Sequence, residues 1–112
     1  MISLNVKELR SLQDKSIGLI GKKTVTPIYF TTRWGIHTFG VLSPIDVLIL
    51  DDENRVVKLR NNLFPNRLFF WNPKYERVIE LPGDTIRKEK IAVGNQVSLK
   101  IITPADRRRL YH

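Results

Sequence analysis

The stretch Ile36-His37-Thr38-Phe39-Gly40-Val41-Leu42-Ser43-Pro44-Ile45-Asp46-Val47-Leu48-Ile49-Leu50-Asp51 decides the fold of this chain. Its second half, 45–50, is mostly apolar with little alternation, which predicts a strand buried on both faces. The acidic run 51–54 is typical of a hairpin turn, and 55–59 predicts the returning strand. The first half predicts a loop that presents His37 and Thr38 beside a rigid sheet.

Further strands are predicted on both sides of this hairpin. Residues 2–6 and 96–102 alternate apolar and polar positions, and 27–32 and 77–81 are rich in β-branched or aromatic residues. Short helices are predicted over 11–20, 84–88 and 104–111, with Asp84 and Thr103 as N-caps. We therefore expect one domain, 1–112, that is mainly β (β-rich α+β): a small curved-sheet, barrel-like or clip-like fold with one to three short peripheral helices.

Residues 61–74 are predicted to form a loop, because Pro65 and Pro73 punctuate them. The loop contains four consecutive large apolar residues, which either cover the core or form an exposed patch that binds a partner. Core cover is favoured, and a homodimer formed through these side chains is the alternative: Leu68, Phe69, Phe70 and Trp71.

The composition excludes several classes of protein. With 112 residues the chain can build one core without staples, and the absence of cysteine excludes disulfides and thiolate metal sites. No segment has the length of apolar sequence that a membrane helix needs, and charged residues interrupt the N-terminus where a secretory signal would be apolar. We expect a cytoplasmic protein that does not contact membranes.

The basic charge raises the question of a nucleic-acid partner. The chain has 19 Lys+Arg against 11 Asp+Glu, a formal net charge of +8. Such a balance is typical of proteins with anionic partners, but scattered charges on a solvated surface explain it equally well. The candidate contacts with nucleic acid are six basic residues, with Trp34 or Trp71 stacking on bases: Arg87, Lys88, Lys90, Arg107, Arg108 and Arg109.

Several short motifs resemble a known family when they are taken in order. The pieces are Lys15-x-x-Gly18-Leu19, His37-Thr38-Phe39-Gly40, Pro44-Ile45-Asp46-Val47, Pro65-x-Arg67, Val78-x-Glu80-Leu81-Pro82-Gly83 and Val93-Gly94-Asn95. Over residues 11–101 the chain resembles domain-of-unknown-function family 192, also called uncharacterised protein family 0127, in its archaeal-type branch. The resemblance implies a compact, mostly β fold with a highly curved sheet and short helices. It implies no settled activity.

The polar residues inside these motifs are the candidate site: His37, Thr38, Asp46, Arg67 and Glu80. His37 is either a general base or metal ligand, or a hydrogen-bonded structural residue. Asp46 either accepts hydrogen bonds from backbone N–H groups of the preceding loop or pairs with Arg67. Arg67 either clamps a carboxylate or phosphate, or closes a salt bridge to Glu80. If all five converge, they form a polar pocket for a small polar or anionic ligand, or a purely structural network.

The leading functional hypothesis is therefore a binding or accessory module with a small polar pocket. A basic nucleic-acid-binding domain is the alternative, and a small hydrolase or isomerase dependent on His37 is the second alternative. The sequence does not favour an enzyme, because it lacks a nucleophile elbow, a phosphate-cradling glycine loop and a His-Glu-x-x-His motif. We expect no metal and no cofactor.

Overall fold

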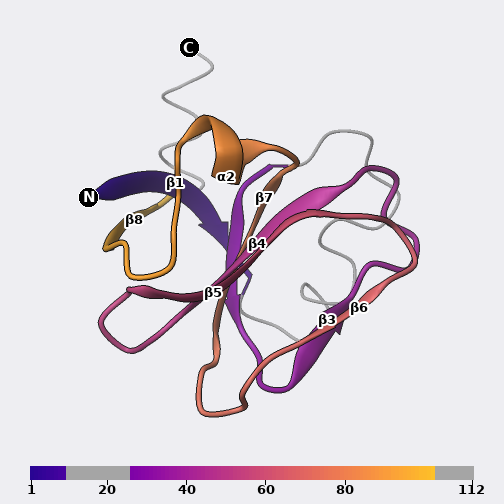
Figure 1. Ribbon diagram of the computed structural model, residues 1–112, viewed down its shortest axis with the longest axis horizontal. Helices are drawn as coiled ribbons and strands as arrows, with labels where there is room; N and C mark the ends of the chain where they lie inside the picture. The colour runs from indigo at the N-terminus through magenta and orange to yellow at the C-terminus, as the bar shows by residue number, and fades with distance from the viewer. Residues whose placement is uncertain (10–25, 103–112) are drawn as a thin grey trace.

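The computed structural model describes residues 1–9 and 26–102. The elements in these ranges are β1 (Ile2–Glu8), β2 (Ile28–Thr31), β3 (Gly35–His37), β4 (Ile45–Leu50), β5 (Val56–Leu63), β6 (Leu68–Phe70), β7 (Arg77–Pro82), α2 (Thr85–Lys88) and β8 (Val97–Ile101). They form a six-stranded sheet in the order β5-β4-β7-β2-β1-β8 and a two-stranded ribbon of β3 and β6 (Figure 1). The expected mainly β fold with a curved sheet is confirmed. The helices expected over 11–20 and 104–111 lie outside the described residues.

The large sheet curls until its two edge strands meet at one end. The start of β5 and the start of β8 are joined by a bridge between Arg55 and Gln96. Backbone hydrogen bonds run from Gly94 N to the Val56 carbonyl (2.8 Å) and from Val97 N to the Asn54 carbonyl (2.9 Å). Since β5 and β8 are the outermost strands of the order, these bonds give the sheet its barrel-like shape.

Strand β4 lies at the centre of the fold, and all six of its residues are buried, as its apolar sequence predicts. Leu48 and Leu50 join a cluster drawn from β1, β5, β7, β8 and α2, which fills the inside of the curl. Ile45, Val47 and Ile49 point to the other face and join a second cluster. That cluster includes Phe69 and Trp71, so the ribbon covers the outer face of the sheet.

The structure corrects the expected loop over 61–74. Strand β5 continues to Leu63, and β6 forms inside the loop and pairs antiparallel with β3. The sequence does not reveal β6, because this strand is only three residues long and its partner, β3, lies about 30 residues earlier in the chain. The polar end of β5 is compatible with a strand because β5 lies at the edge of the sheet, where one side meets solvent. His37 accordingly lies in β3 rather than in a loop.

Candidate functional site

Asp46 is completely buried, and its carboxylate holds together three backbone segments. One oxygen accepts hydrogen bonds from Asn62 N (2.8 Å) and Asp84 N (3.1 Å), and the other accepts one from Ile86 N (2.7 Å). A carboxylate with three amide donors is well satisfied without a cation. Of the two roles expected for Asp46, the structure shows the acceptance of backbone N–H groups. Among the described residues no ion pair joins it to Arg67.

The helix α2 begins at a point that Asp46 fixes. Asp84 occupies the N-cap position as predicted, but its side chain makes no cap hydrogen bond and its backbone is left-handed (φ 68°). The carboxylate of Asp84 instead accepts a hydrogen bond from Asn62 Nδ2 (2.7 Å) and pairs with Arg87 (3.1 Å). The preceding Gly83 is tightly enclosed, because a Cβ there would lie 2.7 Å from Asn62 Oδ1 and 3.0 Å from the Pro44 carbonyl.

Thr38 joins the turn after β3 to the loop before β6. It is completely buried, and its hydroxyl donates to the Phe64 carbonyl (2.7 Å) and accepts from Arg67 N (2.8 Å). Its own backbone N–H donates to the Arg67 carbonyl (2.9 Å). All of these bonds are internal, so Thr38 positions the two loops and leaves no group for a ligand.

Glu80 lies on β7 between Ile28 of β2 and Val47 of β4. Both neighbours belong to the hydrophobic cluster on the outer face of the sheet, called the outer cluster below. Its side chain is almost entirely buried, and burial raises the pKa of the carboxyl to about 7. Within residues 1–9 and 26–102 no ion pair joins Glu80 to Arg67, which was one expectation from the sequence. Glu80 is the most strongly perturbed titratable group of the described part of the chain.

His37, the last residue of β3, and Arg67, which immediately precedes β6, are both exposed. The Nδ1 atom of His37 accepts a hydrogen bond from Phe39 N (3.2 Å), and the imidazole stacks on the Phe39 ring with 5.1 Å between ring centres. The Arg67 guanidinium donates to the Asn66 carbonyl at 3.4 Å. The five candidate residues thus have separate roles: Asp46 and Thr38 hold backbone, Glu80 lies within the outer cluster, and His37 and Arg67 face solvent.

The ribbon exposes a row of apolar side chains on its outer side. Ile36 and Phe69 are opposite each other and pack on the core, so Leu68 and Phe70, which alternate with Phe69, point outward. Leu68 and Phe70 are 56% and 60% exposed, and Trp34, which precedes β3, is 67% exposed. We call the exposed surface of His37, Leu68 and Phe70, together with Trp34 and Phe39 beyond the two ends of β3, the ribbon face. Phe69 and Trp71 cover the core, as the favoured interpretation of 68–71 expected, while Leu68 and Phe70 are exposed.

The geometry of the ribbon face is fixed by the chain beneath it. The Phe70 ring lies directly over Gly35, where a Cβ would be 2.5 Å from a ring carbon. Trp34 has a left-handed backbone (φ 80°), which is unusual for a large residue. Its carbonyl accepts a hydrogen bond from Trp71 N (3.1 Å), so the bend at Trp34 is held by the end of β6. The sequence does not reveal this face, because all four residues of 68–71 are apolar and their alternation of exposure appears only in the structure.

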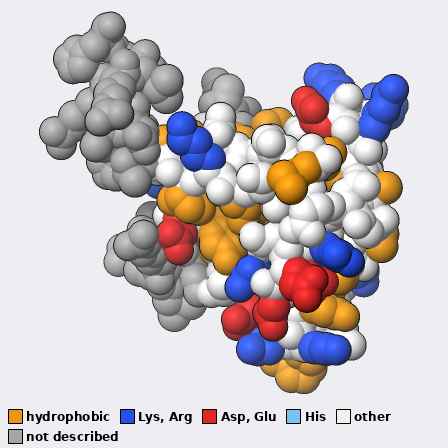
Figure 2. All heavy atoms as spheres, turned by 90° about the vertical axis from the view of Figure 1, so that its left-hand side faces the viewer, with side chains coloured by type: hydrophobic (Ala, Val, Ile, Leu, Met, Phe, Trp, Pro, Cys, Tyr) orange, Lys and Arg blue, Asp and Glu red, His pale blue; other side chains and the backbone are white. Residues whose placement is uncertain are grey.

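The basic residues expected to bind nucleic acid lie away from the ribbon. Arg87 and Lys88 belong to α2 and Lys90 follows it, on the opposite side of the molecule from β3 and β6 in Figure 1. Figure 2 shows that the basic side chains on the side of β8 are separated by neutral and acidic atoms. Arg107, Arg108 and Arg109 lie outside the described residues. Trp71 is buried and donates its indole N–H to the Tyr75 carbonyl (2.8 Å), so of the two tryptophans only Trp34 is free to stack.

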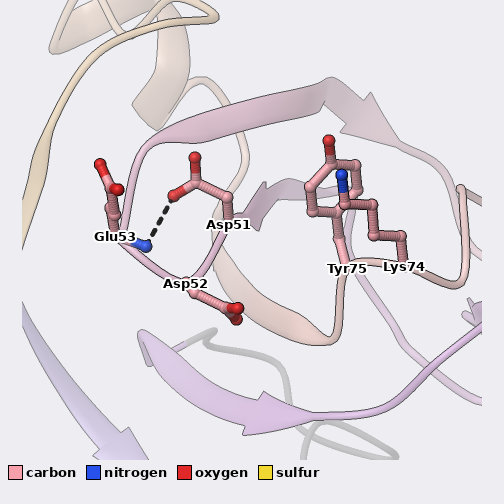
Figure 3. Close-up of a pocket in the computed structure, with 5 residues that line it drawn as sticks. All are labelled: Asp51, Asp52, Glu53, Lys74 and Tyr75. Carbon is pink, nitrogen blue, oxygen red and sulfur yellow. Dashed lines mark hydrogen bonds between the residues drawn. The ribbon is translucent and has the colours of Figure 1, made fainter.

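The acidic turn between β4 and β5 borders an open hollow of about 250 Å³. Figure 3 shows three acidic residues of the turn on one side and Lys74 and Tyr75 on the other. Asp51 uses one carboxylate oxygen to accept hydrogen bonds from the backbone N–H groups of Glu53 and Arg55, both at 2.9 Å. This oxygen of the Asp51 carboxylate is therefore used to close the turn.

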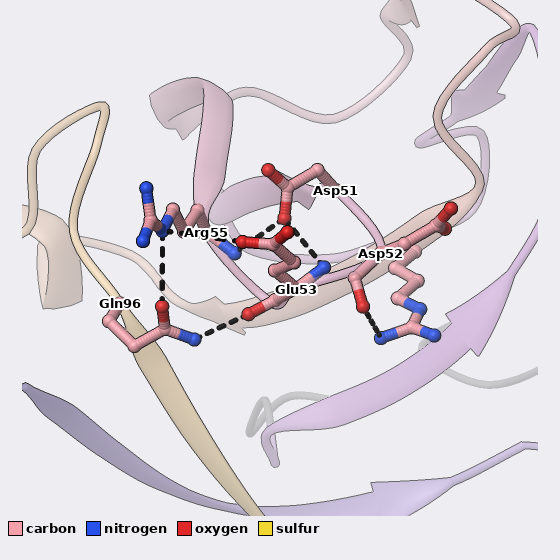
Figure 4. Close-up of polar contacts among 6 residues, drawn as sticks. Asp51, Asp52, Glu53, Arg55 and Gln96 are labelled. Carbon is pink, nitrogen blue, oxygen red and sulfur yellow. Dashed lines mark hydrogen bonds and ion pairs between the residues drawn. The ribbon is translucent and has the colours of Figure 1, made fainter.

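Polar contacts attach the same turn to the start of β8 (Figure 4). Arg55 Nε donates to Gln96 Oε1 (3.3 Å), and Gln96 Nε2 donates to the Glu53 carbonyl. Arg77 donates to the Asp52 carbonyl (3.1 Å) and to Asn54 Oδ1 (2.8 Å). These contacts support the end of the curl where β5 meets β8, so the acidic turn serves the fold.

No group of three or more His, Asp or Glu side chains in residues 1–9 and 26–102 is arranged to hold a metal ion. No helix in this part of the chain is long and apolar enough to cross a membrane.

Comparison with known proteins shows the fold. No protein-family model matches the sequence, and no curated protein matches it significantly. A crystal structure from Sinorhizobium meliloti 1021, described as a "putative transcription regulator", superposes with a TM-score of 0.70 at 14% identity over 84% of this chain and 78% of that chain. A protein of unknown function from Novosphingobium aromaticivorans DSM 12444 gives a TM-score of 0.69 at 14% identity, over 84% of this chain and 71% of that chain. The chain thus shares the fold of these two small bacterial proteins.

Proposed function

We propose that the domain is a binding module and that the ribbon face is its binding surface. The observation that carries the proposal is the exposure of large apolar side chains on and beside the ribbon: Trp34, Phe39, Leu42, Phe64, Leu68 and Phe70 are each 48–67% exposed. With about 200 Å² of surface on each large side chain, half exposure of six presents roughly 600 Å² of apolar surface. This is the summed area of six side chains on and beside the ribbon, and exposed apolar surface of this kind often marks an interaction site.

The core does not require these outward side chains. Inward-pointing Ile36, Phe69 and Trp71 already close the outer face of the sheet. A polar residue at position 68 or 70 would preserve the β3–β6 pairing, because alternate strand residues contribute to opposite faces. Leucine and phenylalanine at these positions are therefore better explained by contact with a partner.

Of the five polar residues suggested by the sequence, one lies on the ribbon face and a second lies beside it. His37 lies on it, and Arg67 immediately precedes β6. An enclosed polar pocket is less well supported, because the polar atoms of Thr38 and Asp46 are used within the fold. We place the binding contribution of His37 and Arg67 at an open surface.

We also propose that the chain is a member of family 192, which its motifs resemble. The support is that motif residues have specific structural duties: Thr38 ties two loops, Asp46 fixes α2, and Gly83 allows close packing against Pro44. Residues with such duties are the ones that a shared fold needs to keep.

Site-specific photo-crosslinking tests the proposed binding surface without assuming a ligand. A photoreactive phenylalanine analogue replaces Leu68 in one variant and Val93 in another, since both side chains are exposed apolar residues (56% and 62%) but Val93 lies beyond α2. In an extract of the source organism, we expect a discrete adduct from position 68 and none from position 93. Equal adduct formation at the two positions, or none at either, would refute the proposal.

A further inference from the structure

We propose that the ligand of the ribbon face is a single-stranded nucleic acid. The inference rests on the proposed function and names the occupant of the same surface. Its basis is the combination of exposed aromatic rings with guanidinium groups on two segments that contain no Asp or Glu.

The charge of the two segments that build the ribbon face is uniformly positive. Residues 33–42 and 64–72 contain Arg33 and Arg67 and no Asp or Glu. Arg33 pairs with Glu76 (3.1 Å), and the two side chains are 53% and 41% exposed. The Arg67 guanidinium donates one long hydrogen bond within the described residues, to the Asn66 carbonyl (3.4 Å). Lys58 adds a third cation next to the ribbon, where its amine donates to the Phe70 carbonyl (2.8 Å). An anionic chain would therefore meet cations along the ribbon.

The aromatic side chains supply platforms for bases. Phe39 already stacks with the His37 imidazole, and Phe70 and Trp34 are mostly exposed. Bases stack on exposed aromatic rings without strong sequence preference, and each stacked base typically contributes about 1–3 kcal/mol. Only unpaired bases can offer their faces to such rings, so the arrangement favours a single strand over a duplex.

A second copy of this chain is the main competing occupant, and charge disfavours it. Two ribbon faces in contact would bring Arg67 of both copies together, and neither 33–42 nor 64–72 contains an Asp or Glu that could pair with it. Like charges at an interface oppose association. A single-stranded nucleic acid offers phosphates to the cations of this surface and flat bases to its aromatic rings.

The test is a binding titration with defined oligonucleotides. The probes are a fluorescein-labelled oligothymidylate and oligouridylate of about 12 nucleotides, a length within the roughly 4–16 nucleotides that single OB-fold domains occupy. Polyphosphate, which has charge but no bases, is the competitor. We expect the oligonucleotides to bind, polyphosphate to compete weakly, and the affinity to fall with added salt.

Variants locate the binding surface. Trp34→Asn keeps a residue tolerant of the left-handed backbone and removes one stacking ring, so we expect binding to weaken roughly 5- to 100-fold. Phe70→Ser is the second ring variant, which covers the case in which Trp34→Asn loses its fold. Arg67→Gln should reduce the slope of log affinity against log salt by about 0.7, the value for one phosphate contact on a single strand. Lys88→Gln and Val93→Ser, on the α2 side, should bind as the parent does.

The possible failures separate this inference from the proposed function. Absent oligonucleotide binding together with a position-68 crosslink to a protein would overturn the nucleic-acid ligand and leave the ribbon face as a binding surface. A dimer in sedimentation that Phe70→Ser dissociates would overturn it in favour of a second copy. If Lys88→Gln weakens oligonucleotide binding and the ribbon variants leave it unchanged, the oligonucleotide binds on the α2 side. That result would overturn the ribbon face as the nucleic-acid site. Absence of both binding and crosslink would remove the two proposals together.

Discussion

The buried carboxyl of Glu80 should make the stability of this domain depend on pH in an unusual direction. Carboxylates in most folded proteins are stabilised in their charged form, so stability falls as the solution is acidified. Burial of Glu80 has the opposite effect and raises the pKa of its carboxyl from 4.5 to about 7. Between pH 4.5 and 7 the folded state therefore keeps a proton that the unfolded state releases. The contribution of Glu80 to the free energy of unfolding is fully present below pH 4.5, falls as the pH rises, and is lost above 7.

The size of the effect follows from the shift in pKa. A difference of roughly 2.5 pKa units, at 1.36 kcal/mol for each unit, corresponds to about 3 kcal/mol. Glu80→Gln keeps the shape of the side chain and removes its titration. The free energy of unfolding of the variant, relative to the parent, should therefore increase by about 3 kcal/mol between pH 4.5 and 7.5.

Urea unfolding followed by tryptophan fluorescence, at intervals from pH 4.5 to 8.5, measures this difference. With a urea dependence of about 1–3 kcal/mol per molar, the unfolding midpoint of Glu80→Gln should rise above that of the parent by roughly 1 M or more at pH 7.5. Glu89→Gln is the matched control, because Glu89 is exposed and should leave the pH profile unchanged. Parallel profiles for Glu80→Gln and the parent would refute the assignment of an uncharged, buried carboxyl.

Three further substitutions test the contacts that hold the loops. Asp46→Asn replaces a three-fold acceptor with a side chain whose NH₂ opposes amide donors, so we expect a loss of about 2–4 kcal/mol in chemical denaturation; a loss below 1 kcal/mol would contradict the bonding described. Thr38→Val leaves the Phe64 carbonyl and the Arg67 amide without their hydroxyl partner and should destabilise by roughly 1–3 kcal/mol in the same assay, whereas an unchanged midpoint would show that water replaces the hydroxyl. Gly83→Ala places a methyl group against backbone and should lower stability by about 1–3 kcal/mol in thermal unfolding, and a variant as stable as the parent would mean that the turn moves aside freely.

Patterns of apolar residues were sufficient to predict the central strands. β4 is a run of buried residues that flanking turn signals delimit, and β7 and β8 were found within one or two residues. Local composition is sufficient for these strands, because a strand buried in a sheet needs apolar side chains whatever its neighbours are. The acidic hairpin turn was predicted for the same reason.

The site could not be assembled from the sequence, because its contacts depend on distant pairing. The hydroxyl of Thr38 meets Phe64 and Arg67 only after β3 has paired with β6, and β6 is too short to be distinguished from a loop. Asp46 was correctly expected to accept backbone N–H groups, but its donors come from β5 and the start of α2 rather than from the preceding loop. Glu80 looked like an ordinary polar position, since a single sequence does not show that both neighbouring strands surround it with apolar residues.

The most direct test of the ribbon face as a nucleic-acid surface is chemical-shift mapping of the ¹⁵N-labelled chain with oligothymidylate. The two tryptophans of the chain act as internal reporters, because the indole of Trp34 is exposed and that of Trp71 is buried and bonded to Tyr75. We predict shifts of the Trp34 indole and of the amides around His37 and 67–70, with the Trp71 indole unmoved. Shifts confined to 87–94, or no shifts at any residue, would contradict the account.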